Sequence, residues 1–435
     1  GCGDGQLTAA LRQGGANMVH GLDRDRGDVQ DARAHLQSRG LYGPVSVAHR
    51  DGGALPYVDN LVNLLVLDAD ADVPRNEVER VLAPGGAAVV RRKGKWVTRK
   101  KPRAGSIDEW THYLHDPTNN AVSSDGQVGP PRHMQWRARP LWSRYHHTLA
   151  SISSVVSSGG RIFYIADRSP PASIKIRADW HLMARDAFNG ALLWQKELPS
   201  WAWYRRRFRS GPPQLPRLLV ATDGRVYAPL GLNKPISALD AGTGRMLNTY
   251  GQTDNAEECI VVDGTLLAVC GTPVAEQAKG HELFKEKYTY PNRKSLAALD
   301  ADTGDLLWEW KGENGPVPQT LASDGSRVFF KAGRGITCLD LQSGEKLWQY
   351  GEGGRPAAGR RRLGYATHVL VVSGGVVLSR LGGRLTAVSA ETGEKLWDCP
   401  AGAGFHAPAD VFAIDDLVYQ GQHPRDSVAP PPVKD

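Results

Sequence analysis

A short phrase that recurs along this 435-residue chain constrains its fold more than any other feature. Each copy alternates apolar and polar residues, turns at a pair formed by Asp, Thr, Ser or Asn with Gly, and alternates again, ending at a Trp in four copies of five. A period of two places one set of side chains on one face, and Gly supplies the positive φ of a tight turn, so each copy predicts a β-hairpin. The copies are ITCLDLQSGEKLW (336–348), LAALDADTGDLLW (296–308), LTAVSAETGEKLW (385–397), LMARDAFNGALLW (182–194) and ISALDAGTGRMLN (236–248).

A second strand–turn–strand phrase precedes each hairpin, so each repeat supplies four strands. These phrases are SSGGRIFYIA, TDGRVYAPL, VDGTLLAVC, SDGSRVFFKA and VSGGVVLSRL, and a sixth, IDDLVYQG, follows the last hairpin. The residues that end the third strands lie roughly 40 to 60 positions apart, which is typical of propeller blades with loop insertions. They are Asp186, Asp240, Asp300, Asp340 and Ser389. We therefore predict a mainly β fold, with a β-propeller over residues 151–435 that has five complete blades and a partial sixth.

The LDxxTGxxLW phrase resembles the repeat of pyrroloquinoline quinone (PQQ)-type β-propellers, and the resemblance covers residues 150–423. That family includes quinoprotein alcohol dehydrogenases and the lipoprotein propeller of the bacterial outer-membrane assembly machinery. The resemblance implies that the repeated Trp and Gly dock one blade on the next. We therefore expect four tryptophans to be packing residues and not ligand contacts, namely Trp194, Trp308, Trp348 and Trp397.

Residues 1–92 carry a different pattern, in which apolar strands alternate with helices. A glycine-rich turn, GCGDG, leads into the helical stretch QLTAALRQGG, and the strands NMVHGLD, VSVAHRD, LVNLLVLDA and GGAAVVRR follow with helices between them. This alternation predicts a parallel sheet with helices on its faces, in an incomplete α/β Rossmann-like domain. We expect the central first strand to be missing and no antiparallel strand to follow Arg92.

The glycine turn and the acidic residues after it resemble class I S-adenosylmethionine (SAM) methyltransferases. Asp23 closes a strand about twenty residues after the turn, where a carboxylate would accept the ribose hydroxyls. By this resemblance Gly1, Gly3 and Gly5 would approach the methionine part of SAM, Asp23 the ribose and Asp51 the adenine. Two alternatives stay open: a domain that binds SAM and transfers methyl groups, and a Rossmann-like domain kept for structure without catalysis.

Residues 93–150 join the two regions and contain too few strand patterns and too many turn formers for a domain. We expect this linker to wrap the propeller rim or to supply its closing strand. His112 and His115 lie three positions apart, and His146 and His147 are consecutive, so a metal site could use three of them. We adopt the alternative, surface histidines packed beside tryptophans, and assign no metal ligand.

Phrases on both sides of the linker resemble bacterial fusion proteins in which a methyltransferase-like module precedes a PQQ-type propeller, often behind an export signal. The phrases are IDEWTHYLHDPTNNAV, VGPPRHMQW and RDAFNGALLW. The resemblance implies an extracytoplasmic location, in the periplasm or at the cell surface. An active methyltransferase would instead be cytoplasmic, because SAM is made and kept there. We also expect a fragment cut at both ends, since the sequence opens within a motif and closes after a half-built blade.

Composition narrows the classes of partner. Hydrophobic residues make up 41% of the chain and charged residues 23%, which is typical of soluble globular proteins, and no apolar run approaches the roughly 18 residues of a membrane span. The net charge of +7 comes partly from basic clusters at 93–103, 204–209 and 359–363, which solvated loops explain better than a nucleic-acid interface. The five cysteines include no CxxC motif, and Cys259 and Cys270 either pair or remain free thiols.

Two insertions in the propeller are candidate binding loops. Residues 200–217 interleave aromatic residues with arginines, a composition suited to stacking on sugars or gripping anions. Residues 272–294 lengthen the third blade, and a solvated surface loop is the interpretation we favour for them.

Three functions fit these patterns. The first is a binding or scaffold protein whose propeller recognises a protein or a polysaccharide, and it requires no catalytic residue. The second is a PQQ-dependent dehydrogenase, for which the resemblance implies PQQ and Ca²⁺ at the propeller axis; the sequence has neither the family's adjacent cysteine pair nor a carboxylate and amide set that matches its ligands. The third is a SAM-dependent methyltransferase whose propeller recruits the substrate. We adopt the first and assign no catalytic residue.

Overall fold

A computed structural model places most of the chain, and its contacts divide the chain into two compact units. The first unit comprises Gly1–Asp108, Ser124–Ala138 and Arg185–Leu193, and the second comprises Glu109–Ser123, Arg139–Ala184 and Trp194–Asp435. The residues that the structure describes are 1–12, 18–68, 71–130, 134–139, 141, 151–172, 176–199, 201, 215–271, 294–317, 319–351, 369–401 and 411–421.

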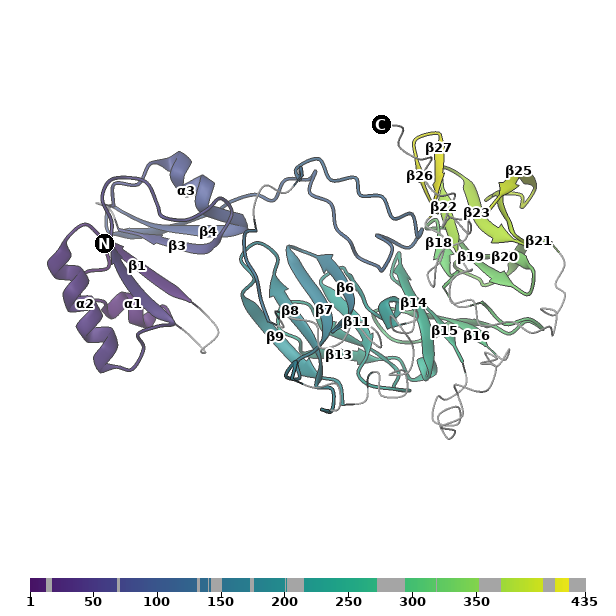
Figure 1. Ribbon diagram of the computed structural model, residues 1–435, viewed down its shortest axis with the longest axis horizontal. Coiled ribbons are helices and arrows are strands. Elements are labelled where there is room, and N and C mark those ends of the chain that lie inside the picture. The colour runs from purple at the N-terminus through teal and green to yellow at the C-terminus, as the bar shows by residue number, and fades with distance from the viewer. Residues whose placement is uncertain are drawn as a thin grey trace, which may run out of the picture. The chain divides into compact units, whose positions relative to one another are not determined.

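The N-terminal region has the predicted alternation of strands and helices (Figure 1). Its elements are α1 (Gln6–Ala10), β1 (Val19–Asp23), α2 (Arg26–Ser38), β2 (Val45–His49), β3 (Val62–Leu67), α3 (Arg75–Val81), β4 (Leu82–Arg92) and β5 (Lys95–Lys100). Strands β1 and β2 form one parallel sheet, and β3 and β4 form a second parallel pair. Helices α1 and α2 contact the first sheet and α3 contacts β4, which confirms the predicted α/β class. The strands form two separate sheets, however, where the sequence pattern predicts one.

Helix α2 buries one face against the first sheet. Asp25 caps the helix, because its carboxylate accepts the backbone N–H groups of Gly27 and Asp28 at 2.6 and 3.2 Å. The apolar residues recur every three to four positions, which places them on one side of the helix. The buried contacts are Val29, Ala32 and Leu36 on α2 with Val45 and Val47 on β2.

The prediction that no antiparallel strand follows Arg92 is wrong. Strand β5 pairs antiparallel with β4, from Arg92 opposite Lys95 to Ala87 opposite Lys100. All six residues of β5 are exposed, and half of them are Lys or Arg. A strand with no buried face lacks the alternation of apolar and polar residues by which strands are recognised, so this sequence indicated only a basic cluster.

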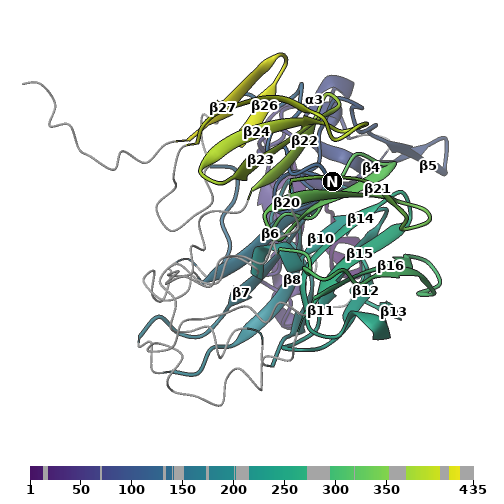
Figure 2. The same ribbon diagram turned by 90° about the vertical axis from the view of Figure 1, so that its right-hand side faces the viewer.

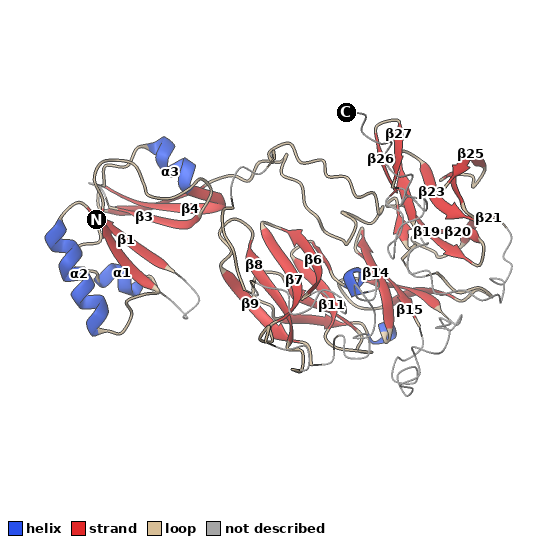
Figure 3. Ribbon diagram, viewed as in Figure 1, coloured by secondary structure: helices blue, strands red, loops and turns tan. Residues whose placement is uncertain are grey.

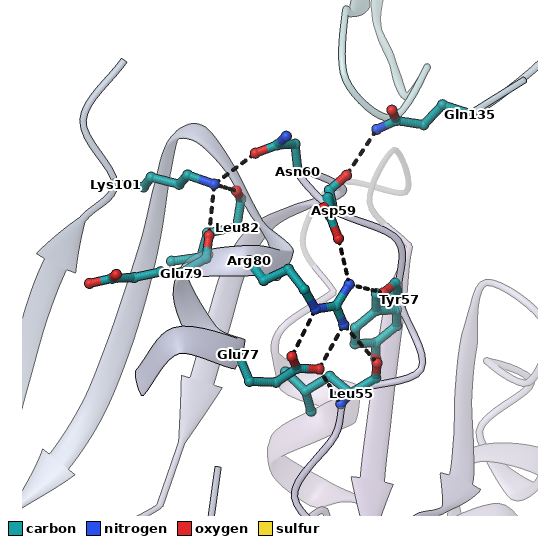
Figure 4. Close-up of polar contacts among 10 residues, drawn as sticks. All are labelled: Leu55, Tyr57, Asp59, Asn60, Glu77, Glu79, Arg80, Leu82, Lys101 and Gln135. Carbon is teal, nitrogen blue, oxygen red and sulfur yellow. Dashed lines mark hydrogen bonds and ion pairs between the residues drawn. The ribbon is translucent and has the colours of Figure 1, made fainter. Parts of the chain in front are cut away.

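Arg80, on α3, fixes the loop that precedes β3 (Figure 4). Its guanidinium donates to both carboxylate oxygens of Glu77, at 2.6 and 2.8 Å, and to Asp59 at 2.8 Å. It also donates to the carbonyl oxygens of Tyr57 and Leu55, while Glu77 accepts the Leu55 N–H at 2.7 Å. The bonds from Arg80 and Leu55 lower the pKa of Glu77 to about 2. Charge-assisted bonds therefore hold a loop that has no regular secondary structure.

The repeats fold as five four-stranded antiparallel sheets in the described part of the chain, and a two-stranded sheet follows them (Figures 1 and 2). Figure 3 shows strands as the main element throughout this region. Strands pair in chain order within each sheet, which is the topology of propeller blades and confirms the predicted fold class. The blades are β6 (Ile152–Ser158), β7 (Arg161–Asp167), β8 (Trp180–Asp186) and β9 (Leu192–Glu197); β10 (Val220–Thr222), β11 (Arg225–Pro229), β12 (Ile236–Asp240) and β13 (Met246–Thr249); β14 (Ala256–Val262), β15 (Thr265–Cys270), β16 (Ser295–Asp300) and β17 (Leu306–Trp310); β18 (Ala322–Ser323), β19 (Arg327–Ala332), β20 (Gly335–Asp340) and β21 (Lys346–Tyr350); β22 (Leu370–Ser373), β23 (Val376–Leu381), β24 (Arg384–Ser389) and β25 (Lys395–Pro400); and the pair β26 (Val411–Ile414) and β27 (Leu417–Gln420).

The residue that ends each third strand shapes the turn after it. The Asp240 carboxylate accepts the backbone N–H groups of Gly242 and Thr243 at 3.1 and 2.8 Å. Equivalent bonds to the residues two and three positions further on are made by Asp186, Asp300, Asp340 and Ser389. These side chains close Asx-type turns. Their spacing is periodic because the same turn follows the third strand of each blade.

Tryptophans dock successive blades on one another. The indole N–H of Trp308 donates to the Leu341 carbonyl oxygen at 2.9 Å, and a Cβ added to Gly344 would lie 2.5 Å from the ring. Gly344 also has a φ of +71°, so both space and backbone conformation require Gly there. Trp194 and Trp348 make the same two contacts, to Ala241 and Gly244 and to Ala390 and Gly393 respectively. The predicted packing role of these three tryptophans is confirmed.

Asn248 stands where the other copies have Trp. A Cβ on Gly304 of the next blade would lie 2.8 Å from the Asn248 amide nitrogen, so this side chain occupies the place of the indole. The carbonyl oxygen of Ala301, equivalent to those that accept an indole N–H, is bound by Tyr250 Oη at 2.6 Å and by Arg225 Nη1 at 2.7 Å. A tyrosine and an arginine thus replace the missing donor.

Trp136, in the predicted linker, makes the same docking contact as the blade tryptophans. Its N–H donates to the Ala187 carbonyl oxygen at 2.9 Å, and a Cβ on Gly190 would lie 2.5 Å from the ring. Residues 134–139 form no regular strand, yet they supply the contact that a fourth strand supplies elsewhere. The expectation that the linker wraps the propeller rim or closes the propeller stays a prediction. Trp397 is 39% exposed, and no equivalent partner for it is present in the described residues.

No helix in the described ranges has both the length and the apolar character that crossing a membrane requires. All five cysteines are free thiols. Cys259 lies opposite Ala268 and Cys270 lies opposite Ala256, so Cys259 and Cys270 are not cross-strand partners.

Candidate functional site

The glycine turn and the carboxyl ends of β1 and β2 form one candidate site. The two strands run parallel with Asp23 opposite His49, and the Arg50 N–H donates to the Asp23 carbonyl oxygen at 2.7 Å. In open α/β sheets, ligands bind beyond the carboxyl ends of the strands. Asp23 ends β1 and Asp51 follows β2, so both lie at the end of the sheet where a ligand is expected.

Two of the three glycines approach Asp23. The Gly3 N–H donates to Asp23 Oδ2 at 3.0 Å, and a Cβ on Gly1 would overlap that carboxylate. Gly5 has a different neighbour: its φ is +82°, and a Cβ there would lie 2.9 Å from the Cα of Ala32 on α2. Gly1 and Gly3 therefore form a cradle beside the acid, whereas Gly5 allows α1 and α2 to approach closely.

The environment of Asp23 keeps its side chain ionised. Burial would raise its pKa, since the residue is 8% exposed, but the backbone N–H groups of Asp25 and Gly3 bind the carboxylate and the pKa lies below its usual value. A buried, ionised carboxylate is a strong acceptor for hydroxyl groups. Asp23 thus provides an ionised hydrogen-bond acceptor at this end of the sheet, and its role in binding a ribose stays a prediction.

Asp51 lies apart from this cluster. Its side chain is 88% exposed, and Oδ1 lies 3.4 Å from Nδ1 of His49. The structure brings Gly1, Gly3 and Asp23 together and leaves Asp51 in solvent at the same end of the sheet. A role for Asp51 in binding adenine stays a prediction.

A second candidate site lies where the blades meet. We call residues 110–120, WTHYLHDPTNN, the central segment. One backbone N–H from the first strand of each of six successive sheets donates to it. The bonds run from Ser157 to Trp110 O (2.7 Å), Ala221 to Thr111 O (3.0 Å), Val261 to His112 Nε2 (3.1 Å), Ser323 to Pro117 O (2.9 Å), Val372 to Thr118 O (2.9 Å) and Ala413 to Asn120 Oδ1 (2.9 Å).

These six donors occupy the same position in their blades. Each lies four residues before the first residue of its blade's second strand, as Ser157 does before Arg161 and Ala413 before Leu417. Equivalent atoms of six blades can reach one short segment only where their first strands converge. In a propeller the first strands converge on the central axis, so the central segment lies there.

Buried charges surround the central segment and are paired. Arg217 and Glu258 are 5% and 0% exposed and form an ion pair of 2.9 Å. Arg217 also donates to Asn119 Oδ1 at 3.1 Å, and the Asn119 amide donates to the carbonyl oxygens of Leu321 and Leu370 at 2.9 and 3.1 Å. Burial raises the pKa of Glu258, and the neighbouring Arg217 opposes that shift. The network ties the central segment to several blades.

His112 uses both ring nitrogens inside the protein. Nε2 accepts the Val261 N–H, and Nδ1 lies 2.8 Å from Thr111 Oγ1. Burial lowers its pKa to about 3, so the ring is neutral. His115 packs edge-on against Trp110, with ring centroids 5.2 Å apart. His115 therefore lies beside a tryptophan, and His112 has no ring nitrogen available for a metal ion. Both histidines are buried, so the prediction that they lie at the surface is wrong.

The described residues contain no group of three or more His, Cys, Asp or Glu side chains arranged to hold a metal. His146 and His147 lie outside the described residues, as do residues 202–214 and 272–293 and the basic clusters at 204–209 and 359–363. The two candidate binding loops therefore stay predictions.

The sequence did not predict the Arg217–Glu258 pair. Glu258 stands in a strand, AEECIVV, whose inward residues are otherwise apolar, and an acid among buried apolar residues was the available signal. Its partner follows an insertion and has no pattern of its own. Only the folded chain shows that the two side chains meet.

Two protein families match parts of the chain. Residues 279–419 match the family described as outer membrane protein assembly factor BamB, and residues 1–86 match the family described as methyltransferase domain. A search of curated proteins found no match.

Several solved structures are similar to this one. BamB from Moraxella catarrhalis has 16% identity and a TM-score of 0.38, with 63% of this chain and 68% of that one covered. A europium-containing methanol dehydrogenase has 14% identity and a TM-score of 0.43 (68% and 58% covered), and the quinohemoprotein alcohol dehydrogenase of Comamonas testosteroni has 14% and 0.44 (73% and 52% covered). The chain thus spans less than two thirds of the length of these dehydrogenases. Together, the family matches and the fold show that the chain is a fusion of a methyltransferase-type domain with a PQQ-type propeller domain.

Proposed function

We propose that this protein acts mainly as a binding or scaffold protein: its propeller recognises a protein or polysaccharide on an outer face, and its N-terminal domain binds SAM. The observation that carries the proposal is the central segment, which places the chain's own residues at the propeller's axis. An axis that the chain itself occupies leaves the blade faces and their loops as the surfaces on which a partner can bind.

PQQ with Ca²⁺ does not fit this propeller. The resemblance to quinoprotein dehydrogenases implies a cofactor at the axis. Here backbone and side-chain groups of residues 110–120 bind the first strand of each of the six sheets that the structure describes in the repeat region. The buried carboxylate of Glu258 is already paired with Arg217 and accepts the Gln319 N–H at 2.6 Å. A calcium ion there would have to displace a buried arginine, which would leave that cation without a partner. We derive no quinone chemistry for this chain.

SAM fits the N-terminal site. Asp23 offers an ionised acceptor at the carboxyl end of β1, and the space beside it is one that a side chain on Gly1 would fill. Asp23 would orient the ribose, and Gly1 and Gly3 would let the backbone approach the ligand. SAM, when bound, supplies a methyl group activated for transfer.

A pair of titrations by calorimetry tests the proposal on the full chain. We expect saturable binding of SAM and no saturable binding of PQQ with Ca²⁺. Saturable binding of PQQ would overturn the interpretation of the axis, because the central segment would have to leave it.

A variant tests whether SAM binds at the proposed site. Asp23→Asn should weaken SAM binding at least about tenfold, since a hydrogen bond to a charged group contributes about 1.5–3 kcal/mol. Asp31→Asn removes an exposed carboxylate from α2 and should leave affinity unchanged. Equal affinities of wild type and Asp23→Asn would contradict the assigned site.

An active SAM-dependent methyltransferase is the second candidate, supported by the family match at residues 1–86. The cellular location of the protein distinguishes an active methyltransferase from a domain kept only for structure. The likeness to an outer membrane assembly factor favours an extracytoplasmic protein, where SAM is not supplied. Cell fractionation of the natural protein tests this: a cytoplasmic pool would favour methyl transfer, and an exported one would favour the binding role.

A further inference from the structure

Two cations occupy equivalent positions in the second strands of the fourth and fifth blades, Lys331 buried and Arg380 half-buried. Lys331 and Arg380 each lie four residues after the start of the second strand, in β19 and β23. The first three blades have apolar residues at this position, namely Ile165, Pro229 and Val269. Blade packing therefore does not require a cation there.

Both cations place a nitrogen atom in the interior. Lys331 is 6% exposed, and its ammonium group donates to the Arg380 carbonyl oxygen at 2.7 Å. The Nη1 atom of Arg380 is buried and has no hydrogen-bond partner. The other buried cations of the described blades differ, because each is paired with a carboxylate: Arg217 with Glu258 at 2.9 Å and Lys294 with Glu257 at 2.6 Å.

This arrangement is costly without a counter-charge. Burial, together with the nearby charge of Arg380, lowers the pKa of Lys331 to about 8, so the group still carries its proton at neutral pH. Like charges placed close together repel each other, and the buried Nη1 of Arg380 loses its hydration without a replacement partner. An anion bound between Lys331 and Arg380 would reduce their repulsion and accept the unpaired N–H.

We propose that Lys331 and Arg380 form an anion-binding site at the seam between the fourth and fifth blades. The site takes a small oxyanion, either phosphate or a carboxylate, free or as part of a larger ligand. Arginine presents paired N–H groups to two oxygens, and lysine adds a point charge beside them. This site is independent of the SAM site and of the central segment.

Thermal unfolding of the full chain in phosphate, sulfate or acetate, each against chloride at matched ionic strength, tests the proposal. Wild type should be stabilised in a saturable way by at least one oxyanion, and binding should weaken as pH rises above about 8, where Lys331 loses its proton. Preference for acetate would indicate a carboxylate ligand, and preference for phosphate a phosphate ester.

Variants test whether Lys331 and Arg380 cause the stabilisation by oxyanions. Arg380→Leu and Lys331→Met give these blades the apolar character of the first three, so the fold should be retained. Each change should weaken oxyanion binding at least about tenfold, and the double variant should lose the response. Lys346→Met removes an exposed cation from β21 and should keep the wild-type response. If chloride stabilises wild type as well as every oxyanion does, or if the double variant still responds, the proposal is wrong.

Discussion

Arg217 and Glu258 show at the residue scale how the propeller retains buried charges. Both lie in the interior, and each is bound by the other and by polar groups of neighbouring segments. Arg217→Met should therefore destabilise the protein by about 3 kcal/mol or more, because it leaves a buried carboxylate without its cation. The midpoint of urea unfolding, followed by tryptophan fluorescence, measures the loss.

An exposed ion pair provides the matched control. Arg384 and Asp398 pair on the surface of the fifth blade, with side chains 49% and 27% exposed. Arg384→Met should cost less than about 1 kcal/mol, since water already solvates both groups. Comparable losses for the two variants would contradict the importance of burial at Arg217.

His112 makes stability depend on pH. Its pKa is lowered from 6.5 to about 3 by burial, so between these values the unfolded chain binds a proton that the folded protein does not. The free energy of unfolding should therefore fall as pH decreases through this window. His112→Gln, whose amide oxygen can still accept the Val261 N–H, should show a shallower decline in urea unfolding measured from pH 7 to pH 4. An unchanged slope would mean that other groups cause the dependence.

At the scale of elements, the hairpin turns carry the contact between blades. Gly344 and Gly264 both have positive φ, +71° and +73°, but only Gly344 faces an indole, that of Trp308. Gly264→Ala should cost about 1–2 kcal/mol from backbone strain alone. Gly344→Ala should cost about 1–3 kcal/mol more, because its Cβ would overlap the ring. Urea unfolding measures the free energy of unfolding of both variants. Equal losses would show that the indole ring moves aside at little cost in free energy.

Elements could be predicted from the sequence where their own residues form a local pattern that indicates burial or a turn. The hairpins were recognisable because alternating side chains, an Asp and a Gly all lie within one phrase, and the glycine turn with Asp23 was recognisable by spacing. Strand β5 was missed because no face of it is buried. The central segment was missed because its partners are single backbone atoms of six blades, and the Arg217–Glu258 pair because its members are far apart in the chain. Contacts of that kind depend on the folded topology, which local patterns do not encode.

At the scale of the whole molecule, the central segment makes the blades depend on one another. Successive blades also touch through their tryptophans, but those contacts join only neighbours. Residues 110–120 bond to all six sheets in chain order. A propeller held this way should open as one unit, because losing the segment removes a partner from every first strand.

Asn119→Ala tests that coupling. The side chain binds Leu321 O, Leu370 O and Arg217, so its removal should loosen the central segment along its length. Amide hydrogen exchange should then accelerate at the donors in all six sheets, Ser157 and Ala413 included, and not only near residue 119. Thr243→Ala, which alters one exposed turn, should accelerate exchange only locally. If the Asn119 variant also changes exchange only in the fourth and fifth blades, each blade is stabilised by its neighbours, and the central segment lies at the axis without coordinating the blades around it.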